Sequence, residues 1–237
     1  MQWQQQVAVV TGANRGLGRA LTQALLGRGV AKVYACSRRG ICDDDPRLIP
    51  VTLDITCEQQ IMALTERAQD ATLLINNAGI NGFGDALGAP MASIQAEMET
   101  NAFGTLRLIR ALVPDLRHKP DATIVNVISV CALAGMPGLA GYSASKAALF
   151  SLHQSLIPLL QEQGIQLLGA FPGPIDTEMN AGQAVAEMAT AESVAQAILT
   201  GIAQRQAMIF PDSIGKEVQA QWQADPLALA GQFRQYR

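Results

Sequence analysis

The chain has 237 residues, of which 49% are hydrophobic and 16% charged, and its formal net charge is −3. This length is within the range of one α/β domain with a sizeable core, and no second domain is required. A net charge that is slightly negative does not favour binding to nucleic acid or to acidic membranes. A local basic cluster is typical of the solvated face and end of one helix: Arg107, Arg110, Arg117, His118 and Lys119.

Cysteines and hydrophobic stretches exclude further classes of site. The four cysteines, Cys36, Cys42, Cys57 and Cys131, form no Cys-x-x-Cys pair and have no neighbouring histidines, so we expect neither a metal site nor a redox dithiol. The first residues lack a secretory pattern, and we expect a cytoplasmic protein. Residues 122–145 carry no charge, but their Asn, Ser, Pro and three Gly residues fit a strand, a loop and a helix start better than a membrane span.

The first predicted strand, residues 7–10, leads into a turn with Gly12, Gly16 and Gly18 and then a helix over 16–26. Glycines at these spacings let the backbone turn tightly and approach a pyrophosphate at a helix N-terminus. The pattern therefore predicts a dinucleotide site. Taken alone, it is equally typical of a tight βα connection.

The second predicted strand, residues 33–36, indicates which dinucleotide is preferred. An NAD site would place an acidic residue at its end to bind the ribose hydroxyls. The position holds Ser37, followed by Arg38 and Arg39, and Arg15 lies in the glycine turn. Guanidinium groups suit a 2′-phosphate, so NADP(H) is favoured and NAD(H) stays possible. The alternative is that these arginines lie at a strand end and bind no cofactor.

The remaining elements alternate along the chain. Strands are predicted over 48–53, 73–75, 123–128, 166–171 and 207–210, and helices over 58–68, 93–116, 143–163 and 192–204. Short continuous apolar strands are typical of a parallel sheet covered on both faces, so we predict a doubly wound α/β fold with ligands at the carboxyl ends of its strands. Residues 39–47 are too short and too rich in helix breakers for a crossover helix, and we expect a loop there.

Tyr142 and Lys146 form the strongest chemical signal. They are spaced i, i+4 and so lie on one helix face, and Tyr142 comes thirteen positions after Ser129. A phenol normally ionises near ~10, and we expect the lysine to lower the pKa of Tyr142. Tyr142 is thus predicted to be a general acid/base.

Together these motifs resemble the short-chain dehydrogenase/reductase family over nearly the whole chain. The resemblance rests on Thr11-Gly-x-x-x-Gly-x-Gly18, Asp54-Ile-Thr56, Asn76-Asn-Ala-Gly79, Asn101, Ser129, Tyr142-x-x-x-Lys146 and Pro172-Gly-Pro-Ile-Asp-Thr177, in the order and spacing of the family. It implies a single Rossmann domain over 1–237 with about seven strands, which includes the catalytic site and a short substrate lid over about 178–189.

The resemblance also implies residue roles. The implied catalytic set is Asn101, Ser129, Tyr142 and Lys146, with Ser129 binding the carbonyl oxygen and Asn101 supporting a water chain from Lys146. A lone Asn within a helix is otherwise a poor helix former. The implied cofactor set is Thr11, Gly12, Asn14, Arg15, Gly16, Leu17, Gly18, Ser37, Arg38, Asp54, Ile55, Asn77, Ala78, Gly79, Tyr142, Lys146, Pro172, Gly173, Ile175 and Thr177. Asp54 is equally suited to capping a helix, and Asn76 and Asn77 to satisfying strand ends.

The expected activity is hydride transfer between NADPH and a carbonyl or secondary alcohol. The expected substrate wall is apolar or small, without a charged anchor: Phe83, Val130, Cys131, Ala132, Met136, Pro174 and Met179. A close alternative is a β-ketoacyl carrier-protein reductase, and one of another class is a catalytically idle NADP(H)-binding module. By resemblance the protein is a homodimer or homotetramer paired through residues 93–116 and 143–163. The stretch 222–237 either closes the pocket or reaches a neighbouring subunit.

Overall fold

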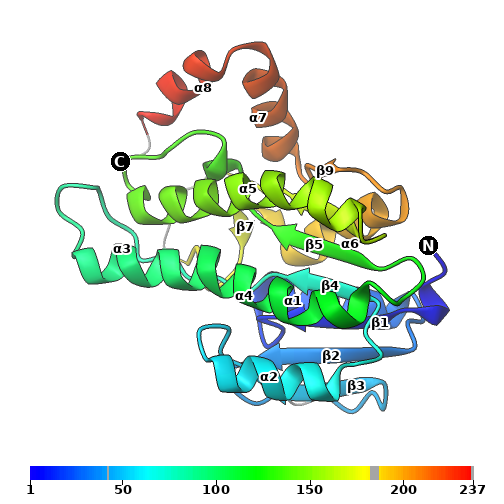
Figure 1. The fold of residues 1–237 in the computed structure, drawn as a ribbon. Helices are drawn as coiled ribbons and strands as arrows, with labels where there is room; N and C mark the ends of the chain where they lie inside the picture. The colour runs from blue at the N-terminus through cyan, green and yellow to red at the C-terminus, as the bar shows by residue number, and fades with distance from the viewer. Residues whose placement is uncertain (42, 182–186, 236–237) are drawn as a thin grey trace.

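A seven-stranded parallel sheet forms the centre of the molecule (Figure 1). The computed structural model describes residues 1–41, 43–181 and 187–235. In spatial order the strands are β3 (Leu48–Thr52), β2 (Lys32–Ser37), β1 (Val7–Thr11), β4 (Leu73–Asn76), β5 (Thr123–Val127), β6 (Gln166–Ala170) and β9 (Met208–Ile209). Each pair of neighbours is parallel. The predicted doubly wound α/β fold with one domain and seven strands is confirmed.

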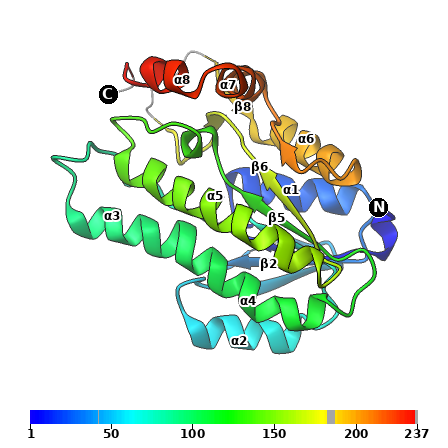
Figure 2. The ribbon, with the colours of Figure 1, turned by 45° about the horizontal axis from the view of Figure 1, so that its top comes forward.

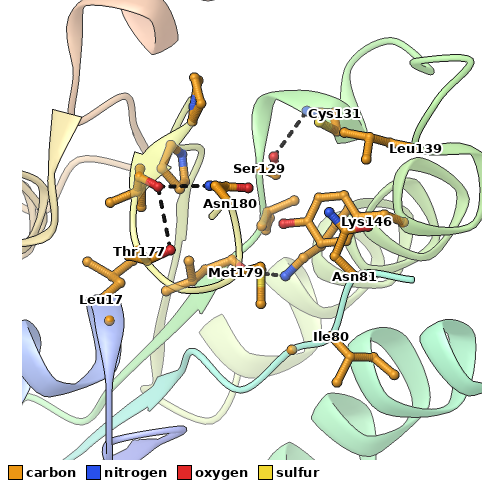
Figure 3. A pocket seen from close by; sticks show the side chains of 18 of the residues that line it. Leu17, Ile80, Asn81, Ser129, Cys131, Leu139, Lys146, Thr177, Met179 and Asn180 are labelled. Atoms are coloured by element: carbon orange, nitrogen blue, oxygen red, sulfur yellow. Dashed lines mark hydrogen bonds between the residues drawn. The ribbon is translucent and has the colours of Figure 1, made fainter. Parts of the chain in front are cut away.

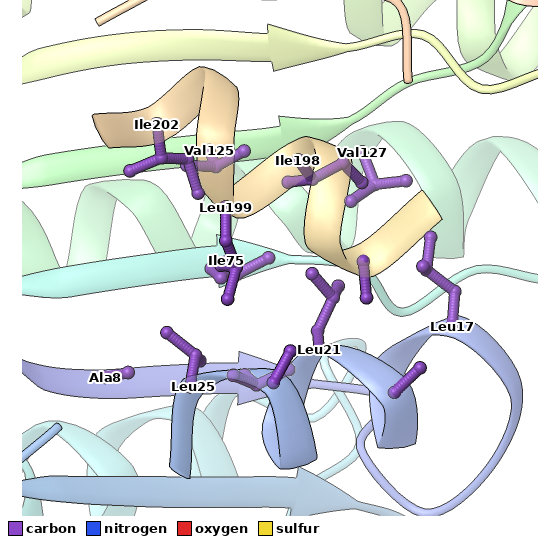
Figure 4. Packing of buried hydrophobic residues seen from close by; sticks show 14 of the residues in the cluster. Ala8, Leu17, Leu21, Leu25, Ile75, Val125, Val127, Ile198, Leu199 and Ile202 are labelled. Atoms are coloured by element: carbon purple, nitrogen blue, oxygen red, sulfur yellow. The ribbon is translucent and has the colours of Figure 1, made fainter. Parts of the chain in front are cut away.

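Helices cover both faces of this sheet (Figure 2). The helices α1 (Gly16–Gly27) and α6 (Ala191–Ala203) share one hydrophobic cluster with the sheet, and α2 (Glu58–Arg67), α4 (Thr105–Leu116) and the end of α5 (Ala140–Gln161) share a second. In Figure 4, Leu21 and Ile198 project from the first pair of helices toward the strands. Burial on both faces explains why the strands are continuously apolar.

The predicted helix over 93–116 is three consecutive segments. They are α3 (Met91–Glu97), a π-helical turn η2 (Met98–Gly104) and α4. Asn101 lies in the π-helical turn rather than in a regular helix. Such turns add one residue to the helical repeat and are frequent at functional sites.

Several elements were not predicted. The short strands β7 (Ile175–Asp176) and β8 (Ala189–Thr190) pair with each other, and a 3₁₀ turn, η1 (Trp3–Gln5), precedes β1. The helices α7 (Ser213–Ala224) and α8 (Pro226–Phe233) pack on a second 3₁₀ turn, η3 (Val130–Ala132), through an apolar cluster. Two-residue strands are too short to produce a periodic pattern.

Three other sequence expectations bear on the fold. Between β2 and β3 the described residues form no helix, as expected for residues 39–47. The uncharged stretch 122–145 forms β5, η3 and the start of α5. Over the described ranges, no helix has the length and hydropathy needed to cross a membrane. Of the predicted lid over 178–189, residues 182–186 lie outside the described residues.

Candidate active site

The site lies where the strand order reverses, between β1 and β4. At such a switch point the loops after neighbouring strands diverge and leave a crevice at the carboxyl ends. Thr11, at the end of β1, joins the two loops: its hydroxyl oxygen accepts hydrogen bonds from the Asn77 N–H (3.0 Å) and the Ala78 N–H (2.9 Å). The Asn77 amide donates to the Thr11 carbonyl at 2.9 Å.

Glycine is required at two positions of the turn after β1. Gly12 has φ +66°, a left-handed conformation that side chains rarely adopt. A Cβ on Gly18 would lie 2.1 Å from the Gly12 carbonyl oxygen, because the start of α1 packs directly on the turn. The backbone is therefore bare where a pyrophosphate would approach the helix N-terminus. These residues fit a dinucleotide.

The end of this crevice beside β2, where the resemblance implies that the adenosine half of the cofactor binds, carries exposed arginines. Arg15 and Arg38 are exposed side chains that line it, while Ser37 is buried and its hydroxyl donates to the Arg39 carbonyl. Burial raises the pKa of Asp54, but hydrogen bonds from Thr56 and the charge of Arg38 outweigh burial, so the net shift is downward. The two bonds run from the Thr56 N–H (2.9 Å) and hydroxyl (2.7 Å). Asp54 therefore stabilises the turn before α2 but does not cap that helix, whose N-cap residue is Cys57.

The helix α5 carries Tyr142 and Lys146 toward the other end of the crevice. Lys146 is 4% exposed, its ammonium donates to the Val127 carbonyl at 2.8 Å, and it lies 5.7 Å from the centre of the Tyr142 ring. Burial lowers the pKa of Lys146 to about 8. Ser129 follows β5, and its hydroxyl oxygen accepts from the Cys131 N–H at 3.2 Å.

The expectation that Lys146 lowers the pKa of Tyr142 is wrong for this structure. Burial raises that pKa, nearby Cys131 and Glu97 raise it further, and only a hydrogen bond with Ser129 lowers it. The physical reason is that burial removes water from the phenol and so disfavours the phenolate, while the Lys146 ammonium donates to the Val127 carbonyl and is itself disfavoured by burial.

Asn101 lies behind the crevice, fully buried, and does not line it. Its Oδ1 accepts from the Ile80 N–H at 2.8 Å, and its Nδ2 donates to the Ile80 carbonyl and to the Ser145 hydroxyl, both at 2.9 Å. Gly79 separates it from Lys146: a Cβ there would lie 3.1 Å from Oδ1 and 3.7 Å from the ammonium. Asn101 therefore holds the loop after β4 against α5.

The other predicted residues line one continuous cleft of about 1870 Å³ (Figure 3). Its lining includes Ser129, Tyr142, Lys146 and the whole predicted cofactor set, from Thr11 in the glycine turn to Thr177 after β7. Of the expected substrate wall, only Ala132 is absent from the lining. Figure 3 places Ser129, Cys131 and Lys146 on one side and Thr177, Met179 and Asn180 on the other.

The segment after β6 is held in place by two long-range contacts. The Val130 N–H donates to the Pro172 carbonyl at 3.1 Å. The carboxylate of Asp212 accepts from the Gly173 N–H at 2.9 Å and from the Gly215 N–H, at the start of α7, at 2.7 Å. Asn180 in turn donates to the Ile175 carbonyl at 2.8 Å.

Sequence reasoning missed the contribution of α7 to this cleft, which is Ile214, Glu217, Val218 and Gln221. The stretch 222–237, which was offered as closing the pocket, adds Gln232 and Phe233 from α8 and Gln235 beyond it. Glu217 is a charged group on a wall that was expected to have none. The stretch 222–237 is thus part of the cleft in one chain, as far as it is described. The apolar positions of α7 at intervals of four were the signal that was available.

Two of the structural alternatives are also resolved. The Asn76 amide donates to Asn126 Oδ1 at 2.8 Å, so its partner is a side chain and not a strand-end backbone group. Asn77 does satisfy a backbone carbonyl, that of Thr11. In the described part of the chain, no group of His, Cys, Asp and Glu residues is arranged to hold a metal ion.

Comparison with known proteins decides the family. A family model described as short chain dehydrogenase matches residues 6–188. The chain belongs to the short-chain dehydrogenase family. The resemblance inferred from the motifs, and with it the prediction of an oxidoreductase of this family, is confirmed.

Individual relatives of this short-chain dehydrogenase agree. An oxidoreductase of Myxococcus xanthus is 33% identical over 187 residues, which cover 73% of this chain and 74% of the relative. The 3-oxoacyl-[acyl-carrier-protein] reductase FabG of Vibrio cholerae is 31% identical over 189 residues, covering 76% and 77% of the two chains. A short chain dehydrogenase from Burkholderia cenocepacia, solved in complex with NADP, is 37% identical, with a TM-score of 0.94 over 98% of this chain and 99% of that one.

Proposed function

We propose that this short-chain dehydrogenase is an NADPH-dependent carbonyl reductase in which Tyr142 is the general acid/base. The observation that carries the proposal is the meeting of Ser129, Tyr142 and Lys146 in the same cleft as the glycine turn. A dehydrogenase needs its proton donor beside the site of hydride transfer. A module that only binds a dinucleotide does not require a proton donor, so this group of side chains favours an enzyme.

The basic adenosine end supports NADP(H) as the cofactor. The end of β2 holds Ser37, and Arg38 and Arg39 come directly after it in place of an acidic residue. Arg15 and Arg38 line the cleft there, and guanidinium groups bind phosphate by charge-assisted hydrogen bonds. The similar protein from Burkholderia cenocepacia was solved with NADP. Asp54 and the loop at Asn77–Gly79 are proposed to hold the adenosine half, and Ile175 and Thr177 the nicotinamide half.

The residues of the chain supply the proton and the position of the substrate. The bound dinucleotide would supply the hydride. The Ser129 hydroxyl is placed to bind the carbonyl oxygen, and the phenol of Tyr142 donates the proton that this oxygen gains on reduction. Lys146 is proposed to bind the nicotinamide ribose through its ammonium form, which predominates below pH about 8.

Proton resupply is assigned to Asn101. It is buried beside Gly79 and Lys146, and it fixes the Ile80 backbone by two hydrogen bonds. We infer that it holds the path by which Lys146 exchanges protons with solvent. A π-helical turn at this position is consistent with a functional constraint on the helix.

The proposed substrate is a small, neutral carbonyl compound or secondary alcohol. The cleft beside Ser129 is lined by the apolar side chains of Cys131, Met136, Val218 and Phe233. Burial of apolar surface would supply most of the binding free energy there.

Replacement of Arg38 by Glu tests the cofactor assignment. Because the 2′-phosphate is the feature that distinguishes the two cofactors, the binding of NADPH should weaken by about 1.5–3 kcal/mol and that of NADH much less. Titration of each cofactor by fluorescence measures this. Arg19→Glu, an exposed change on α1 outside the cleft, is the matched control. Equal losses for both cofactors would show that Arg38 does not contact the phosphate.

Replacement of Tyr142 by Phe tests the chemistry. The ring and its packing remain, but the proton donor is lost, so kcat should fall by at least about 10²-fold while the NADPH Kd changes little. Reduction of a panel of ketones, followed through NADPH absorbance, measures kcat. Near-normal turnover in a folded variant would contradict the proposal, and absence of activity in the unmodified protein would favour the idle binding module.

A β-ketoacyl carrier-protein reductase is the second candidate, since the Vibrio cholerae relative has that name. Docking of an acidic carrier protein requires free basic side chains near the cleft. Arg107 is paired with Glu99 in this structure. Comparison of a β-ketoacyl thioester on a carrier protein with the same ketone in free form separates the two candidates through kcat/KM.

A further inference from the structure

Glu97, the last residue of α3, is a buried carboxylic acid with no role in the mechanism above. It is 3% exposed and does not line the cleft. No ion pair is found for it among the described residues. A buried charge is costly unless it is well hydrogen-bonded, so its contacts indicate what it does.

Those contacts join two segments of the active site. Glu97 Oε1 accepts from the Gly82 N–H at 2.8 Å, in the loop that lines the cleft after β4. On the other side, a Cβ on Gly141 would lie 2.1 Å from Oε2. The carboxylate therefore lies against the residue that precedes Tyr142.

Asn101 forms a matching connection one turn further along. It joins Ile80 of the same loop to Ser145, four positions after Gly141 on α5. Glu97 and Asn101 thus make two side-chain contacts, one turn apart, between the α3–η2 segment and α5. The Asn101 contact holds the turn that carries Lys146, and the Glu97 contact holds the turn that carries Tyr142.

Backbone hydrogen bonds make the loop and the start of α5 one unit. The Gly84 N–H donates to the Gly138 carbonyl at 2.8 Å, and the Ala140 N–H donates to the Gly84 carbonyl at 3.1 Å. The start of α5 has no side-chain cap of its own, because Leu139 occupies the N-cap position. Displacement of Glu97 would therefore move both Phe83, on the cleft wall, and Tyr142.

We propose that Glu97 is a positioning residue for Tyr142, which fixes the first turn of α5 against the substrate loop and sets the charge around the phenol. The inference rests on the proposed function, since it assigns Glu97 a part in the same site. The ionisable groups that face Tyr142 among the described residues are Cys131 on η3, Glu97 on α3 and Lys146 on α5. The Glu97 carboxylate raises the pKa of Tyr142, because a second negative charge beside it disfavours the phenolate.

Glu97→Gln removes the charge and keeps an acceptor for the Gly82 N–H. The apparent pKa of Tyr142 should fall, because the negative charge that disfavours the phenolate is removed. In carbonyl reduction, which needs the protonated phenol, the alkaline limb of kcat/KM would move to lower pH. In alcohol oxidation, which needs the phenolate, the acid limb would move in the same direction. Glu66→Gln, an exposed change on α2, is the control for loss of one charge.

A readout without turnover separates this inference from the proposed function. The chain has three tyrosines, so the NMR signal of isotope-labelled Tyr142 can be assigned by comparison with Tyr142→Phe. Its titration should shift downward in Glu97→Gln even when no substrate is known. Failure of every substrate with an intact NMR shift would contradict the proposed function and leave the position of Glu97 supported.

Gly141→Ala tests the contact between Glu97 and α5 from the side of α5. The added methyl group collides with the carboxylate and should lower kcat by about tenfold or more, whereas in a Glu97→Ala background the same methyl should cost little further activity. Additive losses in this double-mutant cycle would overturn the proposal. So would a Glu97→Gln variant that loses thermal stability but titrates like the Glu66→Gln control.

Discussion

Lys146 and His153 lie on the same helix, and burial lowers the pKa of both, to about 8 and about 4 respectively. The two differ in what surrounds them. Lys146 lies in the cleft, where a ligand can stabilise its charge, whereas His153 is 2% exposed beside Asn126, whose amide lies 3.3 Å from its Nδ1. The same physical effect therefore has a functional consequence at one residue and a consequence for stability at the other.

His153 should make the protein acid-sensitive. Its ordinary pKa is 6.5, so between pH 6.5 and about 4 the unfolded chain binds a proton that the folded chain excludes. The free energy of unfolding should therefore fall as the pH drops through this window, by at most about 3 kcal/mol. In His153→Gln this dependence should become shallower, as measured by urea unfolding at several pH values.

The second histidine of the chain is a matched control. His118 is exposed at the end of α4, so His118→Gln removes a histidine without changing the core and is the comparison for His153→Gln. An equally steep dependence in His153→Gln would mean that other groups cause the loss of stability in acid.

Besides its apolar packing on η3, helix α7 is attached to the site by one carboxylate. Asp212 caps the N-terminus of α7 and also holds the Gly173 N–H, so it connects the helix to the loop after β6. This arrangement explains how an element near the end of the chain contributes to the cleft. Loss of either contact leaves a buried N–H without a partner.

Asp212→Asn should therefore lower stability and weaken substrate binding together. The amide retains one acceptor oxygen for two donors, and the expected cost is about 1–2 kcal/mol in unfolding free energy, with a raised KM. Asp225→Asn, at the exposed cap of α8, should have little effect, because there both N–H groups are bound by one oxygen. Chemical unfolding and steady-state kinetics measure the two effects. Equal changes in both variants would show that the bond to Gly173 contributes nothing.

At the scale of the molecule, the outer side of α3 and η2 has apolar side chains on its surface. Met91 is 64% and Phe103 44% exposed, and both line a shallow groove with Ile94 and Met98. Exposed apolar patches of this kind often mark interfaces. Ile94, Met98 and Phe103 lie within residues 93–116, which the family resemblance implies for subunit pairing, and Met91 lies just before them.

We therefore expect a homodimer or homotetramer. Light scattering at micromolar concentration should give a mass at least twice the 25.1 kDa of one chain. Phe103→Glu should shift the protein toward the monomer, because burial of an unpaired charge in an apolar interface is unfavourable. Met62→Glu is the control, as it places a charge at an exposed position on α2. A monomer mass for the unmodified protein would contradict the prediction.

The sequence alone determined the alternation of the seven sheet strands with the helices between them, the glycine turn after β1 and the pairing of Tyr142 with Lys146. Each depends on residues close together in the chain, whose spacing is set by the periods of strand and helix. The tertiary structure alone decided the direction of the Tyr142 pKa shift, the contribution of α7 to the cleft and the contact of Glu97 with Gly141. Burial and contacts between distant segments arise only when the elements pack, so no local pattern encodes them.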